Sequence, residues 1–238
     1  MLILGTDCSE KTCSAALIED GNILGSASLS TGLTHSENLI PMINGLMSLT
    51  GKTYRDVDLF AVSAGPGSFT GVRIGVSTVK GLAFGGNTPC AGLSSLLCMA
   101  YGFTGRDGLV CPVMDARRGQ VYGALFEIKG NSVTRLTPDA AMPAAELAEL
   151  IGREYPGRGV TVCGGGAKMM LSACRDNKNV YPAPPSLMSE SGASVALAAE
   201  AEVGSGRAPV YPGGDGLRPI YLRPSQAERI KTERESTT

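Results

Sequence analysis

The sequence predicts an α/β fold of two similar subdomains, over residues 1–105 and 106–204, followed by a partly disordered tail over 205–238. Short apolar runs typical of strands alternate with longer amphipathic stretches typical of helices. One run, at 59–64, continues into glycines and a helix, which is the basic unit of α/β proteins. The same order of elements recurs in the second half of the chain, so the domain is predicted to be duplicated.

The first half contains strand, hairpin and helix signals in that order. The apolar run 2–5 is followed by two more, at 12–18 and 23–29, and Asp-Gly between the latter two is a hairpin signal. Thr34-His35-Ser36-Glu37 has the form of a capping box, which predicts a helix from there to about Thr50. The strand at 59–64 leads through glycines to a second helix that ends near Phe84.

The second half repeats this order at low identity. Residues 121–131 resemble 12–22, sharing an alanine and the terminal Gly-Asn, and the strand that ends at Asp7 has a counterpart that ends at Asp115. The strand-to-glycine segment 59–65 recurs as 160–166. A duplication explains these matches, and chance similarity between two hairpins is the alternative. A helix is predicted near 189–203. The Gly/Pro-rich and polar segments that follow it predict a partly disordered tail.

Composition excludes several classes of protein. Lys and Arg number 21 against 22 Asp and Glu, so no net positive field draws the chain onto nucleic acid, and contact with RNA is expected only through a partner. The single histidine, His35, excludes a two-histidine metal site, and no metal is expected. Seven cysteines without a C-x-x-C fit a reducing cytoplasm. No apolar run approaches the roughly 18 residues that would span a membrane.

The two N-terminal helices carry more apolar surface than one sheet face needs. On a helical wheel, apolar residues cover about half the circumference of the first helix, whereas a stripe somewhat over 100° wide suffices for a single face. We therefore expect burial on two sides, with the sheet on one and a partner on the other. The alternative is that both helices pack on each other and on the sheet. The predicted partner-binding residues are Leu39, Ile43, Leu46, Met47, Val72, Gly75, Val76 and Val79.

Two glycine turns are candidates for binding a nucleotide or another anion. Backbone N–H groups at a helix N-terminus hold anions, and strand ends in such sheets collect ligands. The first turn lacks the Gly-Lys-Ser/Thr ending of a phosphate-binding loop, so a purely structural turn is the stronger interpretation there. Close strand-to-helix packing explains the second turn equally well. The candidates are Asp7, Gly65, Gly67, Gly71, Gly164, Gly165 and Gly166.

Basic residues supply a second set of candidates, but no catalytic set is apparent. Arg73, Lys80, Arg117 and Arg118 are candidates for contact with a phosphate or a partner carboxylate, and a solvated hairpin turn is the alternative for the last two. His35 falls in the first turn of its helix, where a capping or packing role is expected. With one histidine, the sequence offers no convincing nucleophile and base, and no catalytic residue is assigned.

Five segments together resemble one bacterial family. They are Asp7-Cys8-Ser9, the run from Thr34 to Pro41, the run from Ala64 to Gly75 (AGPGSFTGVRIG), Asp115 to Tyr122 (DARRGQVY) and Tyr221-Leu222-Arg223. This pattern is similar to the TsaB (YeaZ) family and spans nearly the whole chain. The resemblance implies the duplicated fold of actin, sugar kinases and heat-shock ATPases, and an accessory role in making threonylcarbamoyladenosine in tRNA.

The resemblance also implies partners and excludes a role. In that system the related subunit TsaD transfers the threonylcarbamoyl group and holds a metal with an H-x-x-x-H pair, whereas here Leu39 stands four residues after His35. The chain would then be a non-catalytic scaffold that binds TsaD, with the ATPase TsaE, and forms a homodimer when TsaD is absent. No cofactor is expected in the isolated chain, and ATP or ADP is expected only at a shared interface.

Other functions remain open from the sequence alone. An ATP-binding enzyme of the actin or sugar-kinase type would use Asp7 and the second glycine turn, but Asp7-Cys8-Ser9-Glu10 departs from the Asp-x-Gly-Thr of that superfamily. A peptidase is a weaker alternative, because this chain lacks a two-histidine motif. An RNA-binding module would rely on the basic tail, in which the candidate residues are Arg218, Arg223, Arg229, Lys231 and Arg234.

Overall fold

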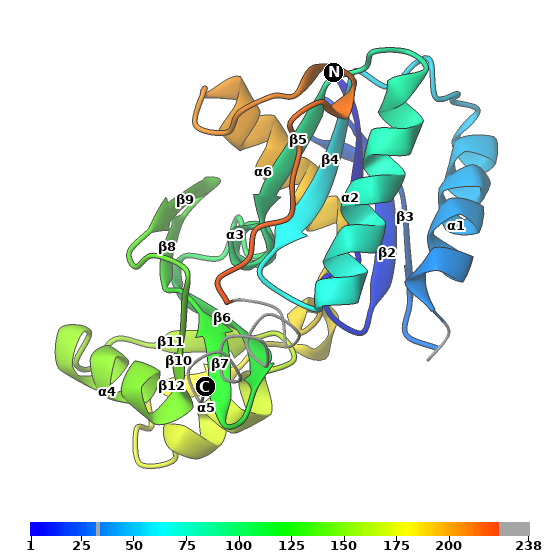
Figure 1. The fold of residues 1–238 in the computed structure, drawn as a ribbon. Helices are drawn as coiled ribbons and strands as arrows, with labels where there is room; N and C mark the ends of the chain where they lie inside the picture. The colour runs from blue at the N-terminus through cyan, green and yellow to red at the C-terminus, as the bar shows by residue number, and fades with distance from the viewer. Residues whose placement is uncertain (32–33, 224–238) are drawn as a thin grey trace, which may run out of the picture.

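The computed structural model describes residues 1–31 and 34–223 and contains two sheets, one from each half of the chain (Figure 1). The first sheet has the strand order β3-β2-β1-β4-β5. Its central strand β1 pairs antiparallel with β2 and parallel with β4, so every residue of β1 is buried. The five strands are β1 (Leu2–Asp7), β2 (Cys13–Glu19), β3 (Asn22–Leu29), β4 (Leu59–Gly65) and β5 (Cys90–Ser94).

Helices α1 (His35–Thr50) and α2 (Phe69–Phe84) lie side by side on one face of this sheet (Figure 1). Glu37 Oε2 accepts from the backbone N–H of Thr34 at 3.4 Å, as the predicted capping box requires, and Gly51 ends α1 with φ of 66°. Ser68 Oγ caps α2 by accepting from the N–H of Gly71. Both helices that the sequence predicted are confirmed.

The second sheet repeats the order of the first. Strands β7 and β8 pair with β6 in one continuous register, with Val113 opposite Gly123 and Val110 opposite Phe126, so together they take the place of β2 beside β1. β11 lies parallel to β6 as β4 does to β1. The elements are β6 (Gly108–Arg117), β7 (Gln120–Gly123), β8 (Phe126–Lys129), β9 (Ser132–Arg135), β10 (Ala140–Pro143), β11 (Val160–Cys163) and β12 (Val180–Pro182), with α4 (Ala144–Glu154) and α5 (Ala167–Ala173) packed on them.

The predicted hairpins stand at equivalent places in the two halves. Asp20 and Gly21 both have positive φ between Glu19 and Asn22, which is the geometry of a two-residue turn between β2 and β3. A second tight turn, with φ of 54° at Gly130, joins β8 to β9. The predicted duplicated α/β fold is therefore confirmed.

The C-terminal part of the chain returns to the first sheet, which corrects the predicted boundaries. α6 (Gly192–Gly204) covers the face opposite α1 and α2, together with α3 (Ser95–Tyr101). Beyond it, Tyr211 bridges to β5, and the N–H of Ile220 donates to the carbonyl of Ala64 at 2.7 Å. Segment 192–220, assigned from the sequence to the second subdomain and the tail, therefore packs on the first. Residues 224–238, with most of the predicted disordered and basic tail, lie outside the described residues.

The residues predicted to bind a partner lie in the core, and this prediction is wrong. They fill the space between the sheet and the inner sides of α1 and α2, and none of the seven apolar side chains among them is more than 6% exposed. Helical periodicity groups residues on one side but does not say which side the sheet takes. The buried set is Leu39, Ile43, Leu46, Met47, Val72, Gly75, Val76 and Val79.

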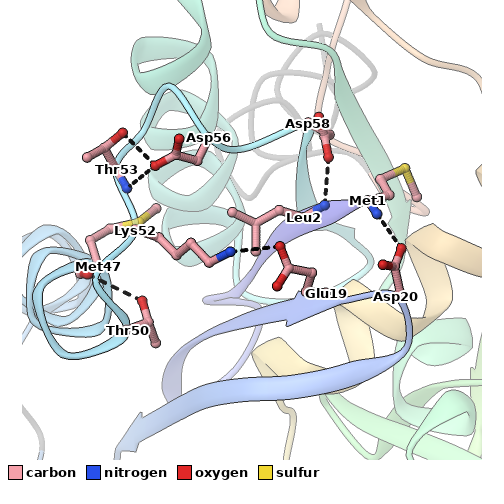
Figure 2. A network of polar contacts seen from close by, with 10 residues as sticks. All are labelled: Met1, Leu2, Glu19, Asp20, Met47, Thr50, Lys52, Thr53, Asp56 and Asp58. Atoms are coloured by element: carbon pink, nitrogen blue, oxygen red, sulfur yellow. Dashed lines mark hydrogen bonds and ion pairs between the residues drawn. The ribbon is translucent and has the colours of Figure 1, made fainter.

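Polar contacts join the segment after α1 to the end of β2 and link the amino ends of β1 and β4 to each other (Figure 2). Just beyond α1, Lys52 Nζ pairs with Glu19 Oε1 at 2.7 Å, and Asp58 Oδ2 accepts from the N–H of Leu2 at 2.7 Å. Figure 2 also shows the Met1 amino group on Asp20. These contacts fix one end of α1 while its other end reaches the opposite edge of the sheet. No helix within the described residues is long and apolar enough to cross a membrane.

Candidate functional site

A cleft of about 600 Å³ lies between the two sheets. It is lined by the turn after β1, the turn between β4 and α2, the end of β6 and the turn after β11. The segment before α6 and residues 220–223 complete it. The carboxyl ends of central strands meet here, which is where ligands of open α/β sheets bind. Asp115, two residues before the end of β6, lines the cleft.

The glycines of the first turn, between β4 and α2, allow close backbone contact with the turn after β1. A Cβ on Gly67 would lie 2.3 Å from the carbonyl oxygen of Ser9, and one on Gly71 would lie 2.0 Å from that of Cys8. The N–H of Ser68 donates to the Ser9 carbonyl at 2.6 Å. Gly65 meets the backbone of Ile220 in the same way. The structure therefore uses this turn for packing, in agreement with the stronger of the two sequence interpretations.

The second turn meets an acidic side chain of the same protein. Cβ atoms on Gly164 and Gly166 would collide with backbone of β6, so these glycines also serve packing. Gly165 faces the cleft, and its N–H donates to Glu10 Oε2 at 2.7 Å. A carboxylate from the first subdomain thus occupies the donor that a bound anion would use.

Glu190, which lines the cleft, and Asp7, which does not, are buried carboxyl groups. The Glu190 side chain is 4% exposed. Its pKa is raised to about 9, first by burial and then by the hydrogen bond to Glu10 and the charge of Glu10. Burial and the charge of Glu190 raise the pKa of Asp7 to about 7. Asp7 does not line the cleft: its Oδ1 accepts from the N–H and Oγ of Ser9, both at 2.7 Å. The raised pKa of Glu190 favours its protonated form at neutral pH.

A phosphate bound at Gly165 would have to displace Glu10. The donor that a phosphate would need at Gly165 is satisfied by Glu10, and Glu190 adds a second carboxyl at the same place. A phosphate there would replace a good hydrogen bond and face carboxylate repulsion. Of the predicted candidates, Gly67, Gly164 and Gly165 line the cleft, whereas Asp7, Gly65, Gly71 and Gly166 do not.

Two of the predicted basic contacts hold the C-terminal segment of the chain itself. Arg73 Nε donates to the hydroxyl of Tyr221 at 2.8 Å, and its guanidinium lies 3.7 Å from the centre of the Phe69 ring. Phe69 and Tyr221 are stacked, with centroids 4.8 Å apart. Lys80 Nζ donates to the carbonyl of Leu217. Sequence reasoning missed this cluster, although Tyr221 and Arg73 both fall in segments that it had singled out.

The other two basic candidates stand at the tip of the hairpin between β6 and β7. Arg117 and Arg118 have φ of 66° and 56°, in the left-handed region that favours glycine. Asp115 Oδ1 accepts from the N–H of Arg117 at 2.7 Å and supports the turn. Both side chains are exposed, and Arg117 lines the mouth of the cleft. Their position is compatible with contact to a phosphate or a partner carboxylate and equally with a solvated turn.

The outward sides of α1 and α2, here called the α1–α2 face, carry exposed apolar side chains interspersed with polar ones. Leu49 and Phe84 are 87% and 85% exposed, and Ile40 is 38% exposed. Gly45 and Gly81 have open space where a side chain would stand, so another backbone can approach closely. Glu37 is the single acidic residue of α1, and the cations of α2 bind the C-terminal segment. These residues, not the buried ones named from the sequence, are available to a partner.

Comparisons with known proteins agree on one family. The family model described as TsaD, tRNA N6-adenosine threonylcarbamoyltransferase, matches residues 30–201. The tRNA threonylcarbamoyladenosine biosynthesis protein TsaB of Escherichia coli (strain K12) is 34% identical over 164 residues, which cover 68% of this chain and 71% of that protein. The protein of the same name from Bacillus subtilis (strain 168) is 34% identical over 151 residues, covering 63% of this chain and 66% of its own length.

Solved structures show the same fold. The structure described as YeaZ from Pseudomonas aeruginosa has a TM-score of 0.79 at 23% identity, with 93% of this chain and 99% of that chain covered. Component A of the (R)-2-hydroxyglutaryl-CoA dehydratase of Acidaminococcus fermentans has a TM-score of 0.51 at 13% identity, covering 84% of this chain and 96% of that chain. At such identity the likeness establishes the architecture alone.

Proposed function

Because the chain belongs to the TsaB (YeaZ) branch of the TsaD family, we propose that it takes part in threonylcarbamoyladenosine biosynthesis in tRNA as a non-catalytic subunit. In this proposal it binds a TsaD-type transferase, and the ATPase TsaE joins the assembly. It reaches tRNA only through that assembly, in the cytoplasm. The observation that carries the proposal is the α1–α2 face, with its exposed Leu49 and Phe84, on a chain whose Gly165 N–H is taken by its own Glu10.

A TsaD-type transferase is the occupant that the family match favours. The model of the TsaD family covers both α1 and α2, so a transferase of that family has segments that correspond to these two helices. Two such surfaces of similar shape are suited to pack against each other, and a second copy of this chain offers the same surface. We therefore propose that the α1–α2 face binds the transferase, and that it forms a homodimer when the transferase is absent.

The test replaces exposed residues only. Leu49→Arg and Phe84→Glu place charge on the α1–α2 face, and each is expected to weaken binding to the transferase by a few kcal/mol, the usual loss at the centre of a packed interface. Tyr181→Glu is the matched control, because Tyr181 is 46% exposed on β12 of the other subdomain. Calorimetric titration with the transferase measures the affinities, and light scattering measures the homodimer. Wild-type affinity in both face variants would refute this surface.

The non-catalytic role is tested separately by reconstitution. The transferase and TsaE are assayed for modified adenosine in tRNA with wild-type chain or with the Glu10→Gln variant. Activity at the wild-type level is expected, because Glu10 serves the fold and not a reaction. Loss of activity in a variant that binds the transferase normally would instead support an enzyme acting at the cleft. We propose that any ATP or ADP binds at an interface shared with the partner, so the isolated chain is expected to show no binding to either nucleotide by calorimetry.

A further inference from the structure

Two cysteines and the single histidine meet where α1 begins. Cys8 directly follows β1 and Cys13 opens β2, and the register that pairs Asp7 with Ser14 places these cysteines opposite each other. Their sulfur atoms are 3.9 Å apart, and neither residue is more than 1% exposed. A ring nitrogen of His35, the first residue of α1, lies with the two sulfurs in a group whose atoms are all within 4.8 Å of one another.

The histidine is held as metal-binding histidines are held. Its Nε2 lies 2.8 Å from the carbonyl oxygen of Glu10, so an Nε2–H donates there and leaves a lone pair on Nδ1. Nδ1 is buried and has no hydrogen-bond partner among the described residues. Histidine ligands in metal sites typically donate their second ring N–H to a backbone carbonyl, which fixes the tautomer. A buried acceptor without a partner is otherwise destabilising.

We propose that Cys8, Cys13 and His35 bind one zinc ion. Two thiols and an imidazole are the ligand types that Zn²⁺ selects, and three protein ligands leave a fourth position for water. Binding converts Zn²⁺ and two thiols into a zinc bis-thiolate and releases two protons to solvent. The charge balance favours Zn²⁺ over Cu⁺, because two thiolates neutralise a divalent ion, whereas a monovalent ion would leave a net negative charge buried beside Asp7.

Cys8 directly follows β1 and Cys13 opens β2, so the two sulfur ligands flank one short turn, while His35 comes from the start of α1. Zinc would join the turn after β1 to the first turn of α1, at the end of that helix opposite the contacts around Lys52 (Figure 2).

The test uses the full-length chain, stripped with a chelator under reducing conditions and titrated with Co²⁺ and then Zn²⁺. One equivalent of Co²⁺ is expected to give thiolate-to-cobalt charge-transfer absorption and the visible bands of a tetrahedral site, and Zn²⁺ is expected to abolish both. Zn²⁺ is also expected to raise the melting temperature. Cys13→Ser should weaken binding by more than about 100-fold, since even outer-shell partners of a metal are worth about 10- to 100-fold. Cys90→Ser, a buried cysteine of β5, should leave binding unchanged.

His35→Asn provides a second route if the cysteine variants fail to fold. It removes the ring nitrogen and is expected to lower Zn²⁺ affinity while the thiolate absorption with Co²⁺ persists. Charge-transfer absorption that survives in the Cys8→Ser, Cys13→Ser double variant would overturn the proposal, as would wild-type protein without that absorption. Mass spectrometry of the chain after the reducing treatment gives one more check. A mass lower by two hydrogens, with the loss mapped to Cys8 and Cys13, would overturn the proposal, because these thiols would then form a disulfide.

Discussion

Glu190→Gln tests whether a proton is held at the floor of the cleft. The Glu190 carboxyl is 4% exposed and its pKa is raised to about 9 by burial and by Glu10. Glutamine has nearly the same shape as the protonated carboxyl and never ionises. The substitution therefore removes the titration while it keeps the packing.

The magnitude follows from proton linkage. The unfolded chain releases this proton near the ordinary pKa of 4.5, whereas the folded chain keeps it until about 9. Between these values the folded state holds one proton more, so its stability falls as pH rises, by about 1.4 kcal/mol per pH unit. From about pH 5.5 to pH 7.5, the stability of the glutamine variant relative to wild type should increase by up to about 3 kcal/mol.

Urea unfolding of both proteins at several pH values measures this difference. Glu202→Gln is the matched control, because burial opposes ionisation of Glu202 but its hydrogen bonds with Arg207 and Tyr101 prevail and lower its pKa. Glu202 is thus ionised in both states above about pH 5.5, and its substitution should cost the same at every pH tested. A pH-independent difference for Glu190→Gln, or one that grows toward acid, would refute the assignment of the proton.

Four further substitutions test local features. Gly71→Ala should destabilise the protein by about 1–3 kcal/mol, because its Cβ would overlap a backbone carbonyl. Gly81→Ala, on the open side of the same helix, should stabilise it by about 0.5–1 kcal/mol. Thermal unfolding of the two variants compares these effects. Arg118→Gly should stabilise by up to about 1 kcal/mol, since φ of 56° disfavours a side chain, and an unchanged urea midpoint would contradict this. Arg73→Met should release Tyr221, seen as faster proteolysis of the C-terminal segment at unchanged cutting elsewhere.

Local signals in the sequence predicted the elements well because they act over a few residues. Asp20-Gly21 needs only its own positive φ values to form a hairpin, and the capping box of Thr34 and Glu37 is complete within one turn. The duplication was also predictable, because each half independently repeats a strand, a hairpin and a strand-glycine-helix unit. The fold and family thus followed from patterns that short stretches of chain carry.

Long-range pairings were not predictable from these patterns. The small, apolar residues of α6 suit either subdomain, and only contacts such as Gly192 against the backbone of Ala15 place it on the first sheet. The inner and outer sides of α1 are both partly apolar, so periodicity alone assigned the partner contact to buried residues such as Leu39. The contact of Glu10 with Gly165 joins residues 155 positions apart, and no local signal announces it.

Glu10 explains how a fold built around a cleft can serve as a scaffold in the proposed function. Its carboxylate crosses from the first subdomain to the N–H of Gly165 in the second, so this contact is a joint between the two halves. A ligand that binds the Gly165 N–H would have to break this joint. The α1–α2 face lies on the outer side of the first sheet and does not depend on that joint, so binding of a partner requires no opening of the cleft.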